Sequence, residues 1–159
     1  MKEVEWQTTE KASRKRSKNF KKSIDNMGVR QQFIVRKYDW EVIIYYTVDK
    51  EQKPEIMEHL RSMGCTGETL SSIESNLHKA APDTGFIYSN YLERKSILIV
   101  HKASSIGEFF NTFEHEKNHL EMHMCEALDI NPYSEKAAHL SGDLAQQILE
   151  EALCSISSL

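Results

Sequence analysis

The apolar residues of this chain follow two different spacings, and these spacings predict where its strands and helices lie. Runs of closely spaced β-branched and aromatic residues predict four strands, at residues 33–38, 41–48, 86–92 and 96–101. Apolar residues three or four positions apart predict four helices, at residues 54–63, 66–81, 105–128 and 133–156. Only short polar turns separate the members of each strand pair, so the strands are expected to form two hairpins. The pattern therefore predicts an α+β fold with a small mixed or antiparallel sheet.

The first 28 residues differ from the rest of the chain in their low apolar content and their positive charge. Residues 11–22 hold seven Lys and Arg side chains and no acidic one, although the whole chain carries a net charge of −4. We therefore predict a weakly ordered basic arm at residues 1–28 and a single domain at residues 29–159. Such an arm can contact nucleic acid or an acidic partner surface, or it can be a solvated tail that folds back on the acidic domain.

Composition excludes several classes of protein. With 159 residues, of which 40% are hydrophobic and 28% charged, the chain has the length and make-up of one soluble globular domain. Its cysteines, Cys65, Cys125 and Cys154, form no Cys-x-x-Cys pair, which argues against a disulfide framework and a thiolate zinc site and favours a reducing compartment. The chain opens without a secretory signal and has no run of roughly 18 apolar residues, so we expect a cytoplasmic protein without a membrane span.

One of the two longest predicted helices, at residues 105–128, contains the motif His115-Glu116-Lys117-Asn118-His119. Residues four apart lie one turn above each other on the same helix face, so His115 and His119 can offer two imidazoles to one metal ion. The carboxylate of Glu116 is placed beside them to accept a proton from a water molecule that the metal has acidified. This pattern predicts a zinc hydrolase. The alternative is that the motif occurs by chance on a polar helix face that binds no metal.

A catalytic zinc site takes three protein ligands, so the motif requires a third. The candidates that follow it in the chain are Glu126, Glu135, His139 and Asp143. Glu126 lies almost two turns beyond His119 on the same helix and points elsewhere. A simple hairpin of the last two helices favours His139, whereas an earlier helix end or a steep crossing angle favours Glu135. Helix geometry alone leaves both open.

A third histidine, His123, continues the series on the same predicted helix. Along a straight helix His115 and His123 are separated by about 12 Å, so one ion cannot bind His115, His119 and His123 together. His123 is therefore predicted either to support a metal ligand or to lie at the surface.

Two segments, residues 113–119 and 134–142, resemble small gluzincin metallopeptidases, including ones related to phage and mobile-element proteins and, more distantly, the ImmA/IrrE-like group. In those proteins a Glu-x-x-Ala-aromatic-Leu-x-Gly pattern follows the His-Glu-x-x-His helix and supplies the third ligand. The resemblance implies Glu135 as this ligand. It places His139 where the pattern has an aromatic residue, so His139 is a substitute ligand or a hydrogen-bond donor to the developing oxyanion. It also implies a zincin-like core, in which residues 86–92 form a sheet edge along the cleft.

These expectations combine into a zinc-dependent metallopeptidase. The resemblance implies that Zn2+ is held by His115, His119 and Glu135. Glu116 would then be the general base for the water molecule that hydrolyses a peptide bond in a protein or peptide substrate. His139 or Tyr133 would stabilise the tetrahedral intermediate. Two alternatives remain. One is a zinc-binding module that regulates or interacts without catalysis, in contact with nucleic acid through its basic arm. The other is a domain without metal, whose histidines are packed polar groups.

Overall fold

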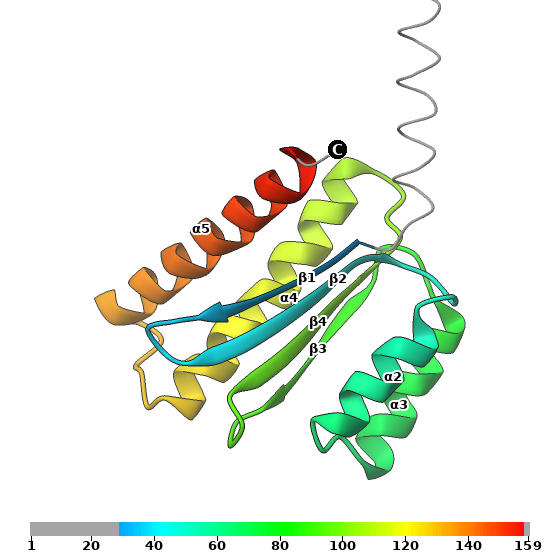
Figure 1. The fold of residues 1–159 in the computed structure, drawn as a ribbon, viewed down its shortest axis with the longest axis horizontal. Coiled ribbons are helices and arrows are strands. Elements are labelled where there is room, and N and C mark those ends of the chain that lie inside the picture. The colour runs from blue at the N-terminus through cyan, green and yellow to red at the C-terminus, as the bar shows by residue number, and fades with distance from the viewer. Residues whose placement is uncertain (1–28, 158–159) are drawn as a thin grey trace, which may run out of the picture.

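The computed structural model describes residues 29–157, so the predicted basic arm at residues 1–28 lies outside the described residues. The described chain forms four strands and four helices (Figure 1). In chain order the elements are β1 (Val29–Val35), β2 (Trp40–Val48), α2 (Lys53–Ser62), α3 (Gly67–Lys79), β3 (Gly85–Asn90), β4 (Lys95–His101), α4 (Ile106–Ala127) and α5 (Glu135–Ser157). This order confirms the α+β class and the predicted elements, with boundaries that differ by a few residues. Among the described helices, none is long and apolar enough to cross a membrane.

The four strands form one mixed sheet in the order β1-β2-β4-β3. β1 pairs antiparallel with β2, and β3 pairs antiparallel with β4, which confirms the two predicted hairpins. Parallel pairing of β2 with β4 joins the hairpins, with Ile43 opposite Ile97 and Ile44 opposite Leu98. The strand β3 is therefore an edge of the sheet, as the sequence predicted.

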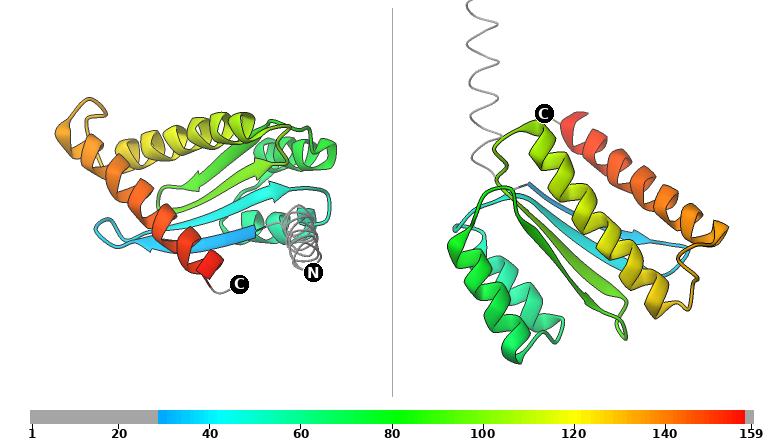
Figure 2. Two further views of the ribbon diagram at one scale, coloured as in Figure 1. Left: turned by 90° about the horizontal axis from the view of Figure 1, so that it is seen from above. Right: turned by 180° about the vertical axis from the view of Figure 1, so that it is seen from behind.

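Helices cover both faces of this sheet. The helices α4 and α5 lie on one face, and α2 and α3 lie on the other (Figure 2). Side chains of β2 alternate between the two layers: Val42 and Ile44 pack towards α4 and α5, whereas Ile43 and Tyr45 pack towards α2 and α3. A central strand that is buried on both faces requires apolar residues at nearly every position. This requirement explains the continuous apolar run in β2.

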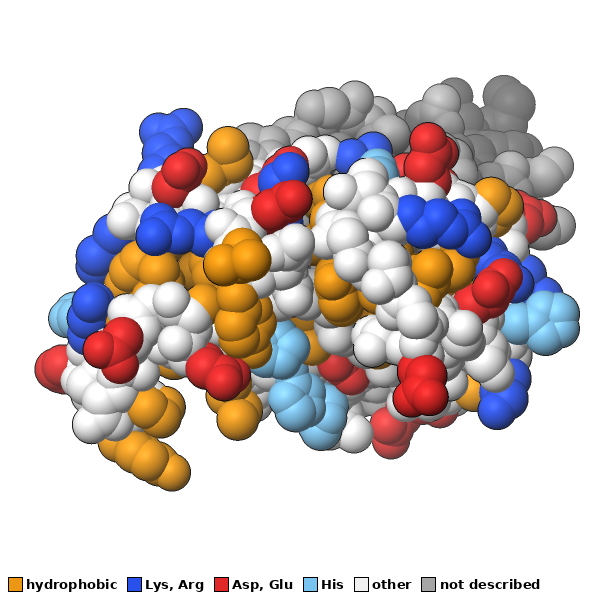
Figure 3. Space-filling model, turned by 90° about the horizontal axis from the view of Figure 1, so that it is seen from below, with side chains coloured by type: hydrophobic (Ala, Val, Ile, Leu, Met, Phe, Trp, Pro, Cys, Tyr) orange, Lys and Arg blue, Asp and Glu red, His pale blue; other side chains and the backbone are white. Residues whose placement is uncertain are grey.

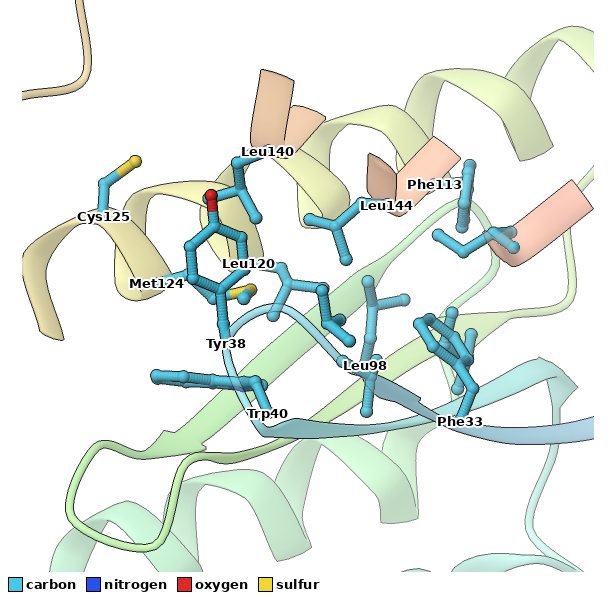
Figure 4. Close-up of a cluster of buried hydrophobic side chains, with 14 of the residues drawn as sticks. Phe33, Tyr38, Trp40, Leu98, Phe113, Leu120, Met124, Cys125, Leu140 and Leu144 are labelled. Atoms are coloured by element: carbon cyan, nitrogen blue, oxygen red, sulfur yellow. The ribbon is translucent and has the colours of Figure 1, made fainter. Parts of the chain in front are cut away.

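The core beneath α4 and α5 sets the rotation of α4 about its own axis (Figure 4). Phe113, Leu120 and Met124 lie on one side of α4 and belong to the same buried cluster as Trp40 and Leu98 of the sheet. Burying one such side chain contributes about 1.5–3 kcal/mol. A rotation of α4 that exposed these side chains would lose several contributions of that size. The buried stripe therefore fixes the rotation of the helix and holds its polar residues at the flanks.

The helix α4 runs between α5 and the β3 edge of the sheet. It contacts β3 and β4, whereas α5 contacts β1 at the opposite edge. Two side-chain amides anchor α5 there: Gln31 Nε2 donates to the carbonyl of Ile148 at 3.0 Å, and Gln147 Nε2 donates to the carbonyl of Ile34 at 2.9 Å. One flank of α4 thus faces α5, and the other flank faces the edge strand β3.

His101, at the end of β4, is buried without a full set of partners. The residue is 2% exposed, and its Nδ1 lies 2.9 Å from the hydroxyl of Thr84. Its Nε2 is buried and has no hydrogen-bond partner in the part of the chain that the structure describes. Burial lowers the pKa of His101, and an opposing contribution from the Thr84 backbone is smaller. The folded protein therefore favours the neutral ring.

We expect the protein to lose stability as the pH falls through the ordinary titration range of histidine. The unfolded chain binds a proton at His101 near pH 6.5 and the folded chain only at a lower pH. The free energy of unfolding therefore decreases on acidification below about pH 7. Denaturant unfolding at about pH 7.5 and about pH 5.5 should show a smaller loss for His101→Phe than for the wild type. His78→Phe, at an exposed position, is the control. An equal loss in His101→Phe and wild type would contradict this origin of the pH dependence.

Candidate functional site

The imidazoles of His115 and His119 meet at the surface of α4. Their Nε2 atoms are 3.2 Å apart, and the ring centroids are 4.8 Å apart with the ring planes at 76°. Two nitrogen ligands at 2.0–2.1 Å from one tetrahedral zinc ion lie about 3.3 Å apart. The pair therefore already has the spacing of two ligands of one ion. The same distance also allows one ring to donate a hydrogen bond to the other when no metal is bound.

Glu116 lies beside this pair but on the buried side of the helix. The residue is 7% exposed, and burial raises the pKa of its carboxyl group, while the neighbouring charges of His115 and His119 act in the opposite direction. Within the described part of the chain its carboxylate has no hydrogen-bond or ion-pair partner. A carboxylate that is partly desolvated, close to two imidazoles and free of partners is suited to accept a proton from a water molecule at the pair.

A glycine on the edge strand makes room for Glu116. A Cβ atom added at Gly85 would lie 2.6 Å from the carbonyl oxygen of Ile99, 2.8 Å from Cγ of Glu116 and 3.1 Å from Cγ2 of Thr112. Both of the shortest distances are well below ordinary contact, and one of them is to backbone. The close approach of α4 to β3, and with it the position of Glu116, therefore depends on the missing side chain at residue 85.

The opposite flank of α4 is occupied by a charged cluster that faces α5. Lys117 is 6% exposed, and its Nζ lies 2.7 Å from Glu121 and 3.4 Å from Glu114. Glu121 also accepts a hydrogen bond from the Ser141 hydroxyl of α5 at 2.9 Å. These partners raise the pKa of Lys117 against the lowering effect of burial, so the ammonium group stays charged. Lys117 is two residues from each histidine of the pair, which places it about 160° away around the helix axis.

The packing of α5 on the Lys117 flank bears on whether this helix can supply a third metal ligand to His115 and His119. Glu135 and His139 are both exposed residues in the first half of α5. Among residues 29–157, no three or more His, Cys, Asp or Glu side chains form a group that could hold a metal ion. The structure therefore brings together His115, His119 and Glu116, but it does not add Glu135 or His139 to them. α5 packs on the Lys117 flank and not beside the two histidines. A third ligand from α5 therefore stays a prediction, and the choice between Glu135 and His139 stays open.

Tyr133, the other residue predicted to stabilise the tetrahedral intermediate, is 96% exposed in the loop before α5. The excluded candidate Glu126 accepts a hydrogen bond from the Tyr91 hydroxyl at 3.0 Å. Asp143 lies 4.0 Å from Nζ of Lys37 at the β1 edge. These partners and exposures give no support for a ligand role of Glu126 or Asp143.

His123 is the site residue that sequence reasoning left unassigned. Its Nδ1 lies 2.9 Å from the hydroxyl of Ser89 on β3, and its ring centroid is 6.5 Å from that of His119. Burial lowers the pKa of His123; the charge of His119 acts in the same direction, and Glu126 opposes them. The spacing of four residues was the available sequence signal. The contact with Ser89, 34 residues earlier in the chain, was not accessible to it.

The surroundings of the histidines are partly apolar. Met122 is 59% exposed and lies three residues after His119, and Tyr91 is 37% exposed with its ring centroid 5.7 Å from that of His123. The space-filling view shows histidine side chains gathered next to hydrophobic ones on one face (Figure 3). A cavity of about 160 Å³ lies elsewhere, among residues of β1, β2, β4 and α2, and includes neither His115 nor His119. That cavity therefore does not mark the candidate site.

Replacing Gly85 by alanine should destabilise the protein by about 1–3 kcal/mol, because the new methyl group must displace either the Ile99 backbone or Glu116. Urea unfolding measures the change. Gly142→Ala is the matched control: it lies in α5, has no atom within 4 Å of an added Cβ, and should be neutral or slightly stabilising. A Gly85→Ala protein as stable as the wild type would show that α4 and β3 do not approach as closely as described.

Comparisons with known proteins add no relative from which a role could be transferred to these residues. The chain matches no family model, no curated protein and no solved structure. The resemblance of residues 113–119 and 134–142 to gluzincin metallopeptidases therefore remains an expectation from those two segments.

Proposed function

We propose that this protein is a zinc-dependent metallopeptidase whose site is built on α4. The observation that carries the proposal is the 3.2 Å separation of the His115 and His119 Nε2 atoms. Beside them is the Glu116 carboxylate, which has no partner among residues 29–157. Two imidazoles and a nearby carboxylate that is not needed as a ligand are the donor set of a hydrolytic zinc site. We propose Glu135 as the third ligand on the strength of the resemblance.

The position of β3 supports a peptide as the substrate. The strand is an edge of the sheet and lies against the flank of α4 that carries His123. One row of its backbone N–H and C=O groups has no strand partner within the described sheet. An extended peptide can pair with such an edge and so be presented to the histidine pair. An edge strand beside a His-Glu-x-x-His helix is also the arrangement expected of a zincin-like core.

In this proposal each residue of the site has a defined role. A bound zinc ion would supply Lewis-acid chemistry, by polarising the scissile carbonyl and lowering the pKa of water. His115 and His119 hold the ion. Glu116 accepts a proton from the attacking water and then returns it to the amine that leaves. Burial raises the pKa of Glu116, which makes its carboxylate a stronger base for the first of these steps.

Zinc binding tests the foundation of the proposal. Titration of the tag-free, full-length protein with zinc should show one site, and His115→Gln should weaken its affinity by more than about 100-fold, beyond the loss typical of a residue that only supports a ligand. Calorimetry measures both. His78→Gln, at an exposed position remote in sequence from α4, should bind zinc as the wild type does. No zinc binding by the wild type would leave a domain whose histidines are packed polar groups.

The same titration identifies the third ligand. Glu135→Gln and His139→Gln each remove one candidate from α5, and both positions are exposed, so neither change should affect folding. We expect Glu135→Gln to weaken zinc binding by more than about tenfold and His139→Gln to have little effect. The reverse order would assign the ligand to His139. No effect of either variant would leave the protein with two ligands in α4.

Loss of the general base separates the enzyme from a zinc-binding module. Glu116→Gln should lower the rate of peptide cleavage by about 10²- to 10⁴-fold and leave zinc affinity nearly unchanged. A mixed synthetic peptide library, read by mass spectrometry, provides the substrate. Glu114→Gln, an exposed neighbour on the same helix, is the control. A zinc-loaded wild type that cleaves no peptide, or no more than Glu116→Gln does, would favour a regulatory or interaction module.

A further inference from the structure

Four side chains form a row of hydrogen bonds that leads from the core to the histidine face of α4. The indole Nε1 of Trp40 donates to the Ser96 hydroxyl at 2.9 Å. The hydroxyls of Ser96 and Ser89 are 2.7 Å apart, and the Ser89 hydroxyl lies 2.9 Å from Nδ1 of His123. The row crosses β2, β4 and β3 before it reaches α4. None of its members takes part in the function proposed above.

The direction of these bonds follows from the first of them. An indole N–H can only donate, so Ser96 accepts from Trp40. Trp40 and Ser96 are 0% and 1% exposed, and among the described residues Ser89 is the other partner of the Ser96 hydroxyl. If Ser96 did not donate to Ser89, its buried hydrogen would have no acceptor, at a cost of about 1–3 kcal/mol. Ser96 therefore donates to Ser89. Among the described residues Nδ1 of His123 is then the acceptor that remains for the Ser89 hydrogen, so Ser89 is assigned as the donor to Nδ1.

This direction sets the tautomer of His123. A ring nitrogen that accepts a hydrogen bond carries no proton, so the proton of the neutral ring is on Nε2. The two ring nitrogens point in diverging directions, and Nε2 therefore faces away from Ser89 and the sheet. Within the described residues Nε2 has no hydrogen-bond partner, and the ring is next to that of His119. An Nε2 atom that carries a proton cannot bind a metal ion, but it can donate to an oxygen atom.

We propose that His123 donates a hydrogen bond from Nε2 to the carbonyl oxygen of the peptide bound beside His119, and that Ser89, Ser96 and Trp40 are positioning residues for this donor. This inference rests on the proposed peptidase function and adds a group that touches the substrate. A donor aimed at an oxygen that gains negative charge during the reaction stabilises the transition state more than the ground state. His123 would thus perform the task that the sequence suggested for His139 or Tyr133.

The tautomer can be measured without metal or substrate. Nitrogen-15 and carbon-13 shifts of the His123 ring, assigned with His123→Gln, should show the Nε2-protonated form in the full-length wild-type protein at about pH 7.5. Ser89→Ala removes the donor to Nδ1, and its ring shifts should move towards those of free imidazole. Finding the Nδ1-protonated form in the wild type, or shifts unaffected by Ser89→Ala, would overturn the proposed row of donors.

The role towards substrate is tested with the peptide that the wild type cleaves best from the library. His123→Ala should lower kcat by about 10²- to 10³-fold with a much smaller change in KM, as expected for loss of one oxyanion donor. His123→Gln retains an N–H donor and should recover part of this loss, and Ser89→Ala should lower kcat less than His123→Ala does. Zinc affinity should stay at the wild-type value in all three variants. His78→Ala is the control at an exposed position.

The outcomes separate this inference from the function on which it rests. A wild type that binds zinc but cleaves no peptide overturns the peptidase, and the donor role falls with it. An active wild type with an equally active His123→Ala overturns the donor role alone. Loss of zinc affinity in His123→Ala would make His123 a ligand and would also overturn the proposal.

Discussion

The packing of α4 against the β3–β4 hairpin is the contact on which the candidate site depends. An apolar stripe that includes Phe113 and Leu120 is buried in the core, and this burial determines how the helix is rotated. Given that rotation, His115 and His119 emerge at the surface and Glu116 is pressed towards the edge strand. Gly85 permits the close approach because a side chain there would collide with the Ile99 backbone and with Glu116. The geometry of the site is thus a consequence of helix packing.

The two flanks of α4 have different tasks. On one flank, Lys117 and Glu121 form a charged cluster that reaches Ser141 of α5, and this cluster is well satisfied by its own partners. On the other flank, the carboxylate of Glu116 and Nε2 of His123 have no partner among the described residues. Neither group is among the described polar atoms that are buried without a partner, so both reach solvent and can be completed by water or by a ligand. The contrast supports a structural role for the first flank and a binding role for the second.

The polar row from Trp40 to His123 links this second flank to the interior of the sheet. Buried hydrogen bonds of this kind contribute modestly to stability but restrict orientation strongly, because each buried donor must meet its acceptor. Ser89 is also part of the edge strand against which a peptide would lie. A single strand therefore carries both the backbone edge available to a substrate and the hydroxyl that orients His123.

By itself the sequence determined the α+β class, the two hairpins, the position of the motif within a long helix and the pairing of His115 with His119. These features depend on residues close together in the chain, where periodicity and a spacing of four act directly. Only the tertiary structure decided that β2 and β4 pair in parallel, that α5 lies on the Lys117 flank away from the histidines, and that Ser89 meets His123. Those contacts join segments that are far apart in sequence, and they follow from how whole faces are buried, which no local pattern encodes.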